Sequence, residues 1–105
     1  MTKVTVDPGN CGFSVSISAR KGEGKGIIIS LETECEMLVN MLEDISLLDM
    51  RSLFTNQINN PVYRSAAKHL KHPACPVPCA ILKAAEVELG LCLPEDVRIT
   101  FKKDT

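Results

Sequence analysis

The chain has 105 residues, of which 45% are hydrophobic and 24% charged, and its formal net charge is −1 at pH 7. This length and composition predict one globular domain over residues 1–105, without a membrane-spanning segment. The near-neutral charge and an aromatic content of 4% exclude the basic, base-stacking surface that binds nucleic acid. The N-terminal residues lack the apolar stretch of a secretory signal, so we expect a cytoplasmic protein.

The first third of the sequence has the alternation of a β-sheet. Residues 4–6 alternate weakly and end at a Pro-Gly turn. Apolar residues occupy every second position over 13–19, and the branched run 27–31 suits a central strand. The stretch 20–26 contains three glycines and joins these two strands, which predicts an antiparallel hairpin.

From Thr33 onward the apolar spacing becomes helical. Thr33 and Glu36 match a capping box, and the first helix should turn one apolar stripe to the core: Cys35, Leu38, Val39, Leu42 and Ile45. A short helix is expected over residues 49–54, with Leu53 and Phe54 inward. Asn60–Pro61 predicts another helix start, with Asn as the N-cap and Pro at the first helical position.

The last third of the sequence predicts a helix and a strand. The helix should run from Pro78 to Leu89, and Gly90 stands where a left-handed C-terminal cap belongs. Over residues 97–101 apolar and polar residues alternate, which predicts a closing strand that can join the hairpin. The fold class is therefore α+β: a small antiparallel sheet of about three strands plus a short closing strand, with three to four helices packed on one face.

Five cysteines are the unusual feature of the composition. Their odd number, without a secretory signal, argues against a disulfide framework. Cys11 lies in a turn before the hairpin and Cys35 in the first turn of the first long helix. Cys75 and Cys79 bracket a Pro-Val-Pro stretch, and Cys79 opens the last helix. Helix N-termini favour thiolates, which bind metals. Cys92 stands between leucines and is interpreted as a small buried hydrophobe.

These placements indicate that Cys11, Cys35, Cys75 and Cys79 bind one iron–sulfur cluster or one tetrahedral metal ion. Four thiolates suit zinc as well as a cluster. His72 is a reserve ligand. The alternatives are a structural zinc site, a metal-free transfer or redox protein with Cys79 as nucleophile, cysteines that only pack, and a structural partner-binding domain.

The order of these features resembles the iron–sulfur cluster scaffold family (NifU N-terminal or IscU-like). Cys11–Gly12 matches the family's first cysteine, Thr33–Cys35 its second, and Cys79–Leu82 its third. The resemblance extends from Asp7 to Gly90 and suggests a divergent member from anaerobic archaea or bacteria. It implies a three-stranded antiparallel sheet against several helices, with the cysteines converging at one end.

For the four cysteines we expect cluster storage, delivery or electron transfer, with a cluster donor or acceptor protein as partner, and a binding role in preference to an enzymatic one. This chain has Phe13 where the family has Asp, Pro78 where it has His, and Cys75 as an additional thiol. These differences favour a retained, thiolate-bound centre. A chain of this size would also gain stability from the metal or from forming a homodimer.

Overall fold

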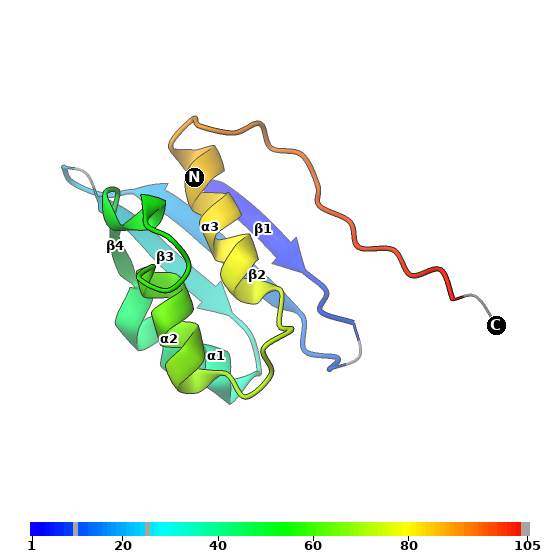
Figure 1. Ribbon diagram of the computed structural model, residues 1–105. Coiled ribbons are helices and arrows are strands. Elements are labelled where there is room, and N and C mark those ends of the chain that lie inside the picture. Colours follow the sequence, from blue (N-terminus) through cyan, green and yellow to red (C-terminus); the bar gives the residue numbers. More distant parts are fainter. Residues whose placement is uncertain (10, 25, 104–105) are drawn as a thin grey trace.

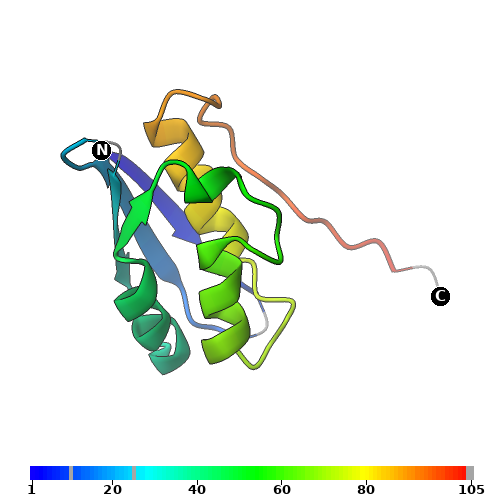
Figure 2. The same cartoon turned by 60° about the vertical axis from the view of Figure 1, so that its left-hand side comes forward.

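The fold is α+β, as predicted, in a computed structural model that describes residues 1–9, 11–24 and 26–103 (Figure 1). The elements in chain order are β1 (Thr2–Val6), β2 (Val15–Lys21), β3 (Gly26–Glu32), α1 (Glu36–Ile45), β4 (Leu47–Asp49), the 3₁₀ helix η1 (Ser52–Phe54), α2 (Pro61–His69) and α3 (Val77–Glu88). The strands form one antiparallel sheet in the order β1-β2-β3-β4, and the helices lie on one face of it (Figures 1 and 2).

The core lies between the sheet and the helices. Because strand side chains alternate, one face of β2 and β3 supplies Val15, Ile17, Ala19, Ile27 and Ile29, all buried. They pack in one cluster with α1 and α3, which contribute the buried residues Leu38, Met41, Ile45, Val77, Ile81, Ala84 and Ala85. The serines of β2 and β3 lie on the opposite face. The predicted hairpin is therefore confirmed, with Ala19 opposite Ile29 in its register.

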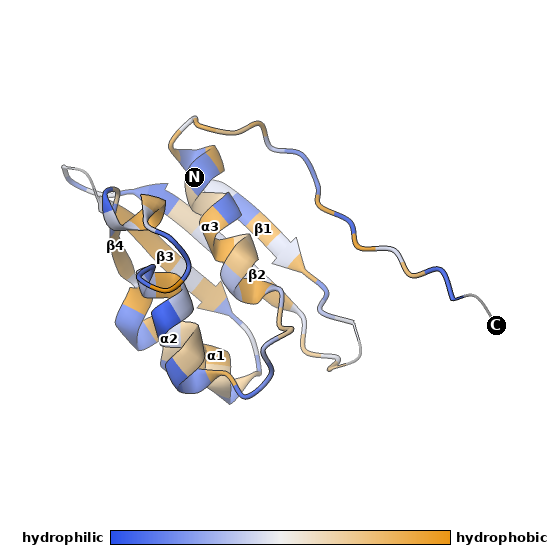
Figure 3. Ribbon diagram, in the orientation of Figure 1, coloured by the Kyte–Doolittle hydropathy of each residue, from blue (hydrophilic) through white to orange (hydrophobic). Residues whose placement is uncertain are grey.

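The predicted closing strand is wrong. Residues 91–103 form neither helix nor strand, and they leave the body of the molecule as an extended segment with alternating apolar and polar residues (Figure 3). The fourth strand is β4, which pairs with β3 directly after α1. The Ile29 amide donates to the Ser46 carbonyl over 2.8 Å and Leu48 is buried, so a short local return of the chain fills the place next to β3.

The predicted capping box is also wrong. Helix α1 begins at Glu36 with Cys35 as its N-cap, and the Thr33 hydroxyl accepts the Cys35 amide over 3.1 Å. Thr33 therefore forms the turn before the helix and does not cap it. The short helix predicted over 49–54 is reduced to η1, and Phe54 is exposed where it was expected to point inward.

The ends of α2 and α3 follow the sequence more closely. Asn60 is the N-cap of α2, and its side-chain oxygen accepts the Val62 amide over 3.0 Å. Helix α3 ends at Glu88. The Gly90 amide donates to Val87 and the Leu91 amide to the carbonyl of Glu86, and Gly90 has a φ of 76°, so the predicted left-handed cap is confirmed.

Two sequence predictions extend outside the described residues. The turn that holds Cys11 and the connection over 20–26 include Asn10 and Lys25. Of the helices that the described residues form, none combines the length and the apolar character needed to cross a bilayer.

Candidate thiol site and the neighbouring pocket

Three of the cysteines lie at one end of the molecule. Cys11 is in the connection from β1 to β2, Cys35 precedes α1, and Cys75 is in the connection from α2 to α3. Figures 1 and 2 both show these three connections side by side at the end of the sheet where β1 and β3 finish. Cys35 and Cys75 are half-buried against the hydrophobic core, and Cys11 is exposed.

Cys75 is the thiol most affected by this arrangement. Burial raises the pKa of the Cys75 thiol, and repulsion from negative charge on Cys11 and Cys35 raises it further, while a hydrogen bond from the backbone at Val77 acts in the opposite direction. The Cys75 amide donates to the carbonyl of His72 over 3.2 Å, which fixes the tight turn before α3. Cys75 is therefore close enough to Cys11 and to Cys35 for negative charge on them to act on its thiol.

A hollow of ≈ 470 Å³ separates the connections that hold Cys11 and Cys35. It is lined by Gly12, Phe13, Ser14, Thr33 and Glu34, so each of the two cysteines directly adjoins a lining residue in the chain. Gly9 and Gly12 have φ values of 84° and 76°, and the Gly12 amide donates to the Gly9 carbonyl over 3.0 Å. A β-carbon at either glycine would meet nothing within 4 Å, so open space surrounds this turn.

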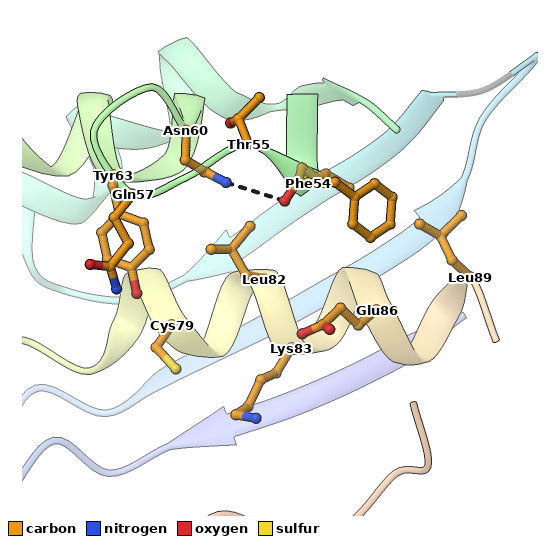
Figure 4. Close-up of a pocket in the computed structure, with 11 residues that line it drawn as sticks. Phe54, Thr55, Gln57, Asn60, Tyr63, Cys79, Leu82, Lys83, Glu86 and Leu89 are labelled. Carbon is orange, nitrogen blue, oxygen red and sulfur yellow. Dashed lines mark hydrogen bonds between the residues drawn. The ribbon is translucent and has the colours of Figure 1, made fainter. Parts of the chain in front are cut away.

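Cys79 faces a different part of the surface. It lines a pocket of ≈ 270 Å³ between α3, α2 and the segment that follows η1 (Figure 4). Cys79, Lys83 and Glu86 reach this pocket from α3, and Tyr63 reaches it from α2. Burial and then the negative charge of Cys79 raise the pKa of the Tyr63 hydroxyl, against a hydrogen bond with Gln57 that lowers it. The structure thus brings Cys11, Cys35 and Cys75 together and turns Cys79 toward this pocket.

Cys92 is exposed, so its interpretation as a buried hydrophobe is wrong. The chain turns sharply at Gly90, and the Cys92 thiol donates to a carboxylate oxygen of Glu86 over 3.4 Å. This hydrogen bond raises the pKa of Cys92, and a smaller opposite effect comes from Lys83. A chain reversal after α3 places Cys92 beside the helix surface and not in the core.

A separate polar cluster joins α1 to α2. The buried Ser65 hydroxyl lies 2.9 Å from a carboxylate oxygen of Asp44, and His69 Nε2 lies 2.9 Å from the same oxygen. The hydrogen bond from Ser65, followed by that from His69, lowers the pKa of Asp44. This contact gives His69 a structural partner, whereas His72 is exposed in the same connection as Cys75.

A site for a single metal ion requires its sulfur ligands to lie close together. A tetrahedral zinc–thiolate site has Zn–S bonds of about 2.3 Å and therefore sulfur atoms roughly 3.8 Å apart. Among residues 1–9, 11–24 and 26–103, no group of three or more Cys, His, Asp or Glu side chains could hold a metal ion as they stand. The metal centre remains a prediction from the sequence.

Fold and site define a small α+β protein with three cysteines in adjacent connections at one end and a further cysteine, Cys79, in a separate pocket. Residues 2–101 match the model of a family of unknown function (DUF6951), and the chain belongs to that family. Neither the curated proteins nor the solved structures gave a match.

The resemblance to the iron–sulfur cluster scaffold family is therefore wrong, because the family found for this chain is a different one. The motifs behind that resemblance were two to four residues long, and the residue taken for the family's third cysteine, Cys79, lines the separate pocket. Short motifs at loop and helix starts recur in unrelated proteins and do not by themselves establish a family.

The sequence also contains a signal for the pocket that lies beside Cys79, and the sequence predictions did not use it. Cys79, Lys83 and Glu86 are spaced i, i+4 and i+7, which places them on one helix face. The contribution of Tyr63 and Asn60 depends on how α2 packs against α3, and no local pattern of residues encodes that packing.

Proposed function

We propose that the three-thiol end, formed by Cys11, Cys35 and Cys75, binds an iron–sulfur cluster. The observation that carries the proposal is that the connections holding these thiols lie side by side at one end of the sheet (Figure 1), with a hollow of ≈ 470 Å³ between the connections of Cys11 and Cys35. Thiolates are the protein ligands of such clusters, and two of these three side chains pack against the hydrophobic core, which would shield part of the cluster from water.

A cluster suits these positions better than a single zinc ion does. A cluster spreads its ligands over several iron atoms, whereas a lone ion requires all sulfur atoms within about 4 Å of each other. A β-carbon at Gly9 or Gly12 would meet no atom within 4 Å, so there is free space beside Cys11 for a bound group. A structural zinc site is the alternative.

The raised pKa of Cys75 predicts how the affinity for the cluster depends on pH. Because burial raises the pKa of this thiol and a metal ligand must be a thiolate, binding competes with its proton. Affinity should therefore rise with pH until the Cys75 thiol titrates. Cys79, in the first turn of α3, is the fourth ligand proposed from the sequence, but its side chain lines the separate pocket. A group from a partner protein is therefore the other source of a fourth ligand.

The proposed role is cluster storage, delivery or electron transfer, with a cluster donor or acceptor protein as partner. These roles require reduced thiols, which fits the proposed cytoplasmic location. Each role needs a ligand set on the surface, and the exposed position of Cys11 leaves the centre accessible to a second protein.

Anaerobic reconstitution with iron and sulfide tests the proposal. The full chain should acquire iron, sulfide and visible absorption, and serine replacement of Cys11, Cys35 or Cys75 should lower the bound iron several-fold. Cys92→Ser is the matched control, since Cys92 is exposed and bonded to Glu86, and it should leave the bound iron unchanged. A colourless protein with one bound zinc would replace the cluster by the structural zinc site. Equal iron in all variants would overturn the proposal.

A specific observation favours a second candidate, thiol chemistry at Cys79. This thiol lines a pocket together with an amine, a carboxylate and a phenol, from Lys83, Glu86 and Tyr63 (Figure 4). If Cys79 is a nucleophile, an alkylating reagent at neutral pH should modify it much faster than Cys92, which is also exposed. Equal rates at Cys79 and Cys92 would remove this candidate.

A further inference from the structure

The segment after α3 has the pattern of a β-strand but no partner within the described residues. Val97, Ile99 and Phe101 alternate with Arg98 and other polar residues, and the three apolar side chains are 61%, 74% and 91% exposed. An isolated strand is not stable in water, because neither its backbone groups nor its apolar face is covered. This extended arm, residues 91–103, therefore has the composition of a strand that pairs with another edge.

The sheet offers such an edge at β1. Strand β1 is the outermost strand on one side and pairs only with β2 among the described strands. Val4 on β1 is half-buried, and so are Ala80 and Val87, which lie on the flank of α3 away from the pocket-lining residues. These residues form a partly covered apolar margin beside the free edge. An added strand with its apolar row on the helix side would cover them.

The other end of the sheet is a poorer acceptor. Strand β4 has only three residues, and the carbonyl oxygen of Asp49 already accepts a hydrogen bond from the Ser52 hydroxyl over 2.8 Å. The chain continues directly from β4 into η1, which leaves little free backbone. Short edge strands of this kind resist pairing with another strand.

The position of the end of α3 determines whether the extended arm pairs with β1 of its own chain or with β1 of a second copy. Glu88 holds the end of α3 at the beginning of β1, since its carboxylate accepts the Thr2 hydroxyl over 2.8 Å and the Lys21 amide over 3.2 Å. The arm therefore starts beside the first residue of β1 and runs in the same direction as β1 (Figures 1 and 2). Pairing with its own β1 would add a parallel strand to a sheet whose pairs are all antiparallel.

We propose that the extended arm of one chain pairs antiparallel with β1 of a second copy, so that two copies exchange arms in a symmetric dimer. A two-fold axis reverses the direction of the arm relative to the other copy's β1, and both edges are covered at once. Each copy contributes residues 91–103, the five residues of β1 and the adjoining flank of α3. That approaches the roughly 20–30 residues per side of a standard protein interface.

Sedimentation of the full chain in reducing buffer over a wide concentration range tests the proposal. The wild type should sediment as a dimer of twice 11.5 kDa, with the reductant excluding disulfide-linked pairs. Ile99→Asp should raise the dimer dissociation constant by more than about a hundredfold, because it would bury an unpaired carboxylate. Thr100→Asp is the matched control on the opposite row, and it should leave the dimer intact. Circular dichroism should show that both variants fold, since both side chains are exposed in the single chain.

Hydrogen exchange of the backbone amides distinguishes pairing of the arm with a second copy from pairing within one copy. Alternate amides among residues 97–101, those that face β1 of the other copy, should exchange slowly in the dimer and rapidly after dilution to the monomer. A monomeric wild type at every concentration would overturn the proposal, and so would protection that survives dilution or a dimer that survives Ile99→Asp.

Discussion

Asn60 connects two parts of the fold through one buried side chain, and its replacement has an effect that can be calculated. Its Oδ1 atom accepts the Val62 amide at the start of α2 over 3.0 Å, and its Nδ2 atom donates to the Leu53 carbonyl in η1 over 3.2 Å (Figure 4). The residue is only 2% exposed, so water cannot readily replace either partner. Both hydrogen bonds should therefore contribute to stability.

Asn60→Ala removes both interactions. Loss of the N-cap costs about 1 kcal/mol and loss of the second hydrogen bond about 1 kcal/mol, so the free energy of unfolding should fall by roughly 2 kcal/mol. For a domain of this size the melting temperature should fall by roughly 8–16 °C. Asn60→Ser keeps an N-cap oxygen but cannot donate to Leu53, so it should lose only about 1 kcal/mol.

Urea denaturation followed by circular dichroism measures both variants. The expected order of stability is wild type, Asn60→Ser and then Asn60→Ala, with an unchanged dependence on urea concentration. If the two variants were equally stable, the cap would contribute nothing. If Asn60→Ala lost less than about 0.5 kcal/mol, the burial argument would be refuted.

Three further predictions concern pH, the end of α3 and the thiols. The hydrogen bond from Ser65 lowers the folded-state pKa of Asp44 below 3.8, so the stabilisation from the Asp44 carboxylate is complete above that value and is lost as pH falls through the folded-state pKa. Acid unfolding followed by circular dichroism should therefore show a weaker loss of stability in Asp44→Asn than in the wild type. Gly90→Ala should lower the free energy of unfolding by about 1 kcal/mol in urea denaturation, because the added β-carbon meets no atom within 4 Å and only the positive φ opposes it. Gly90→Asn should lower the free energy of unfolding less. Iodoacetamide should alkylate Cys75 more slowly than Cys11, as followed by mass spectrometry, because Cys75 is less accessible and its pKa is raised; equal rates would contradict the burial of Cys75.

Local patterns were sufficient for most of the secondary structure. The alternation over 13–19 and the branched run 27–31 predicted the hairpin because a half-buried strand must alternate. Asn60–Pro61 predicted the start of α2 and Gly90 the end of α3, since caps depend on a few neighbouring residues. The same local signals also predicted that the cysteines lie in connections and at helix starts.

Long-range packing decided what the local patterns could not. Residues 97–101 have the alternation of a strand, whereas Leu47–Asp49 have no such signal, yet it is Leu47–Asp49 that follow α1 and pair with the edge of β3. Which cysteines adjoin depended on the meeting of connections that are far apart in sequence, and this placed Cys11 with Cys35 and Cys75 and left Cys79 in a pocket with Tyr63. Residue type and spacing determine which element forms, whereas the side on which each thiol emerges depends on how helices and sheet bury their apolar faces together.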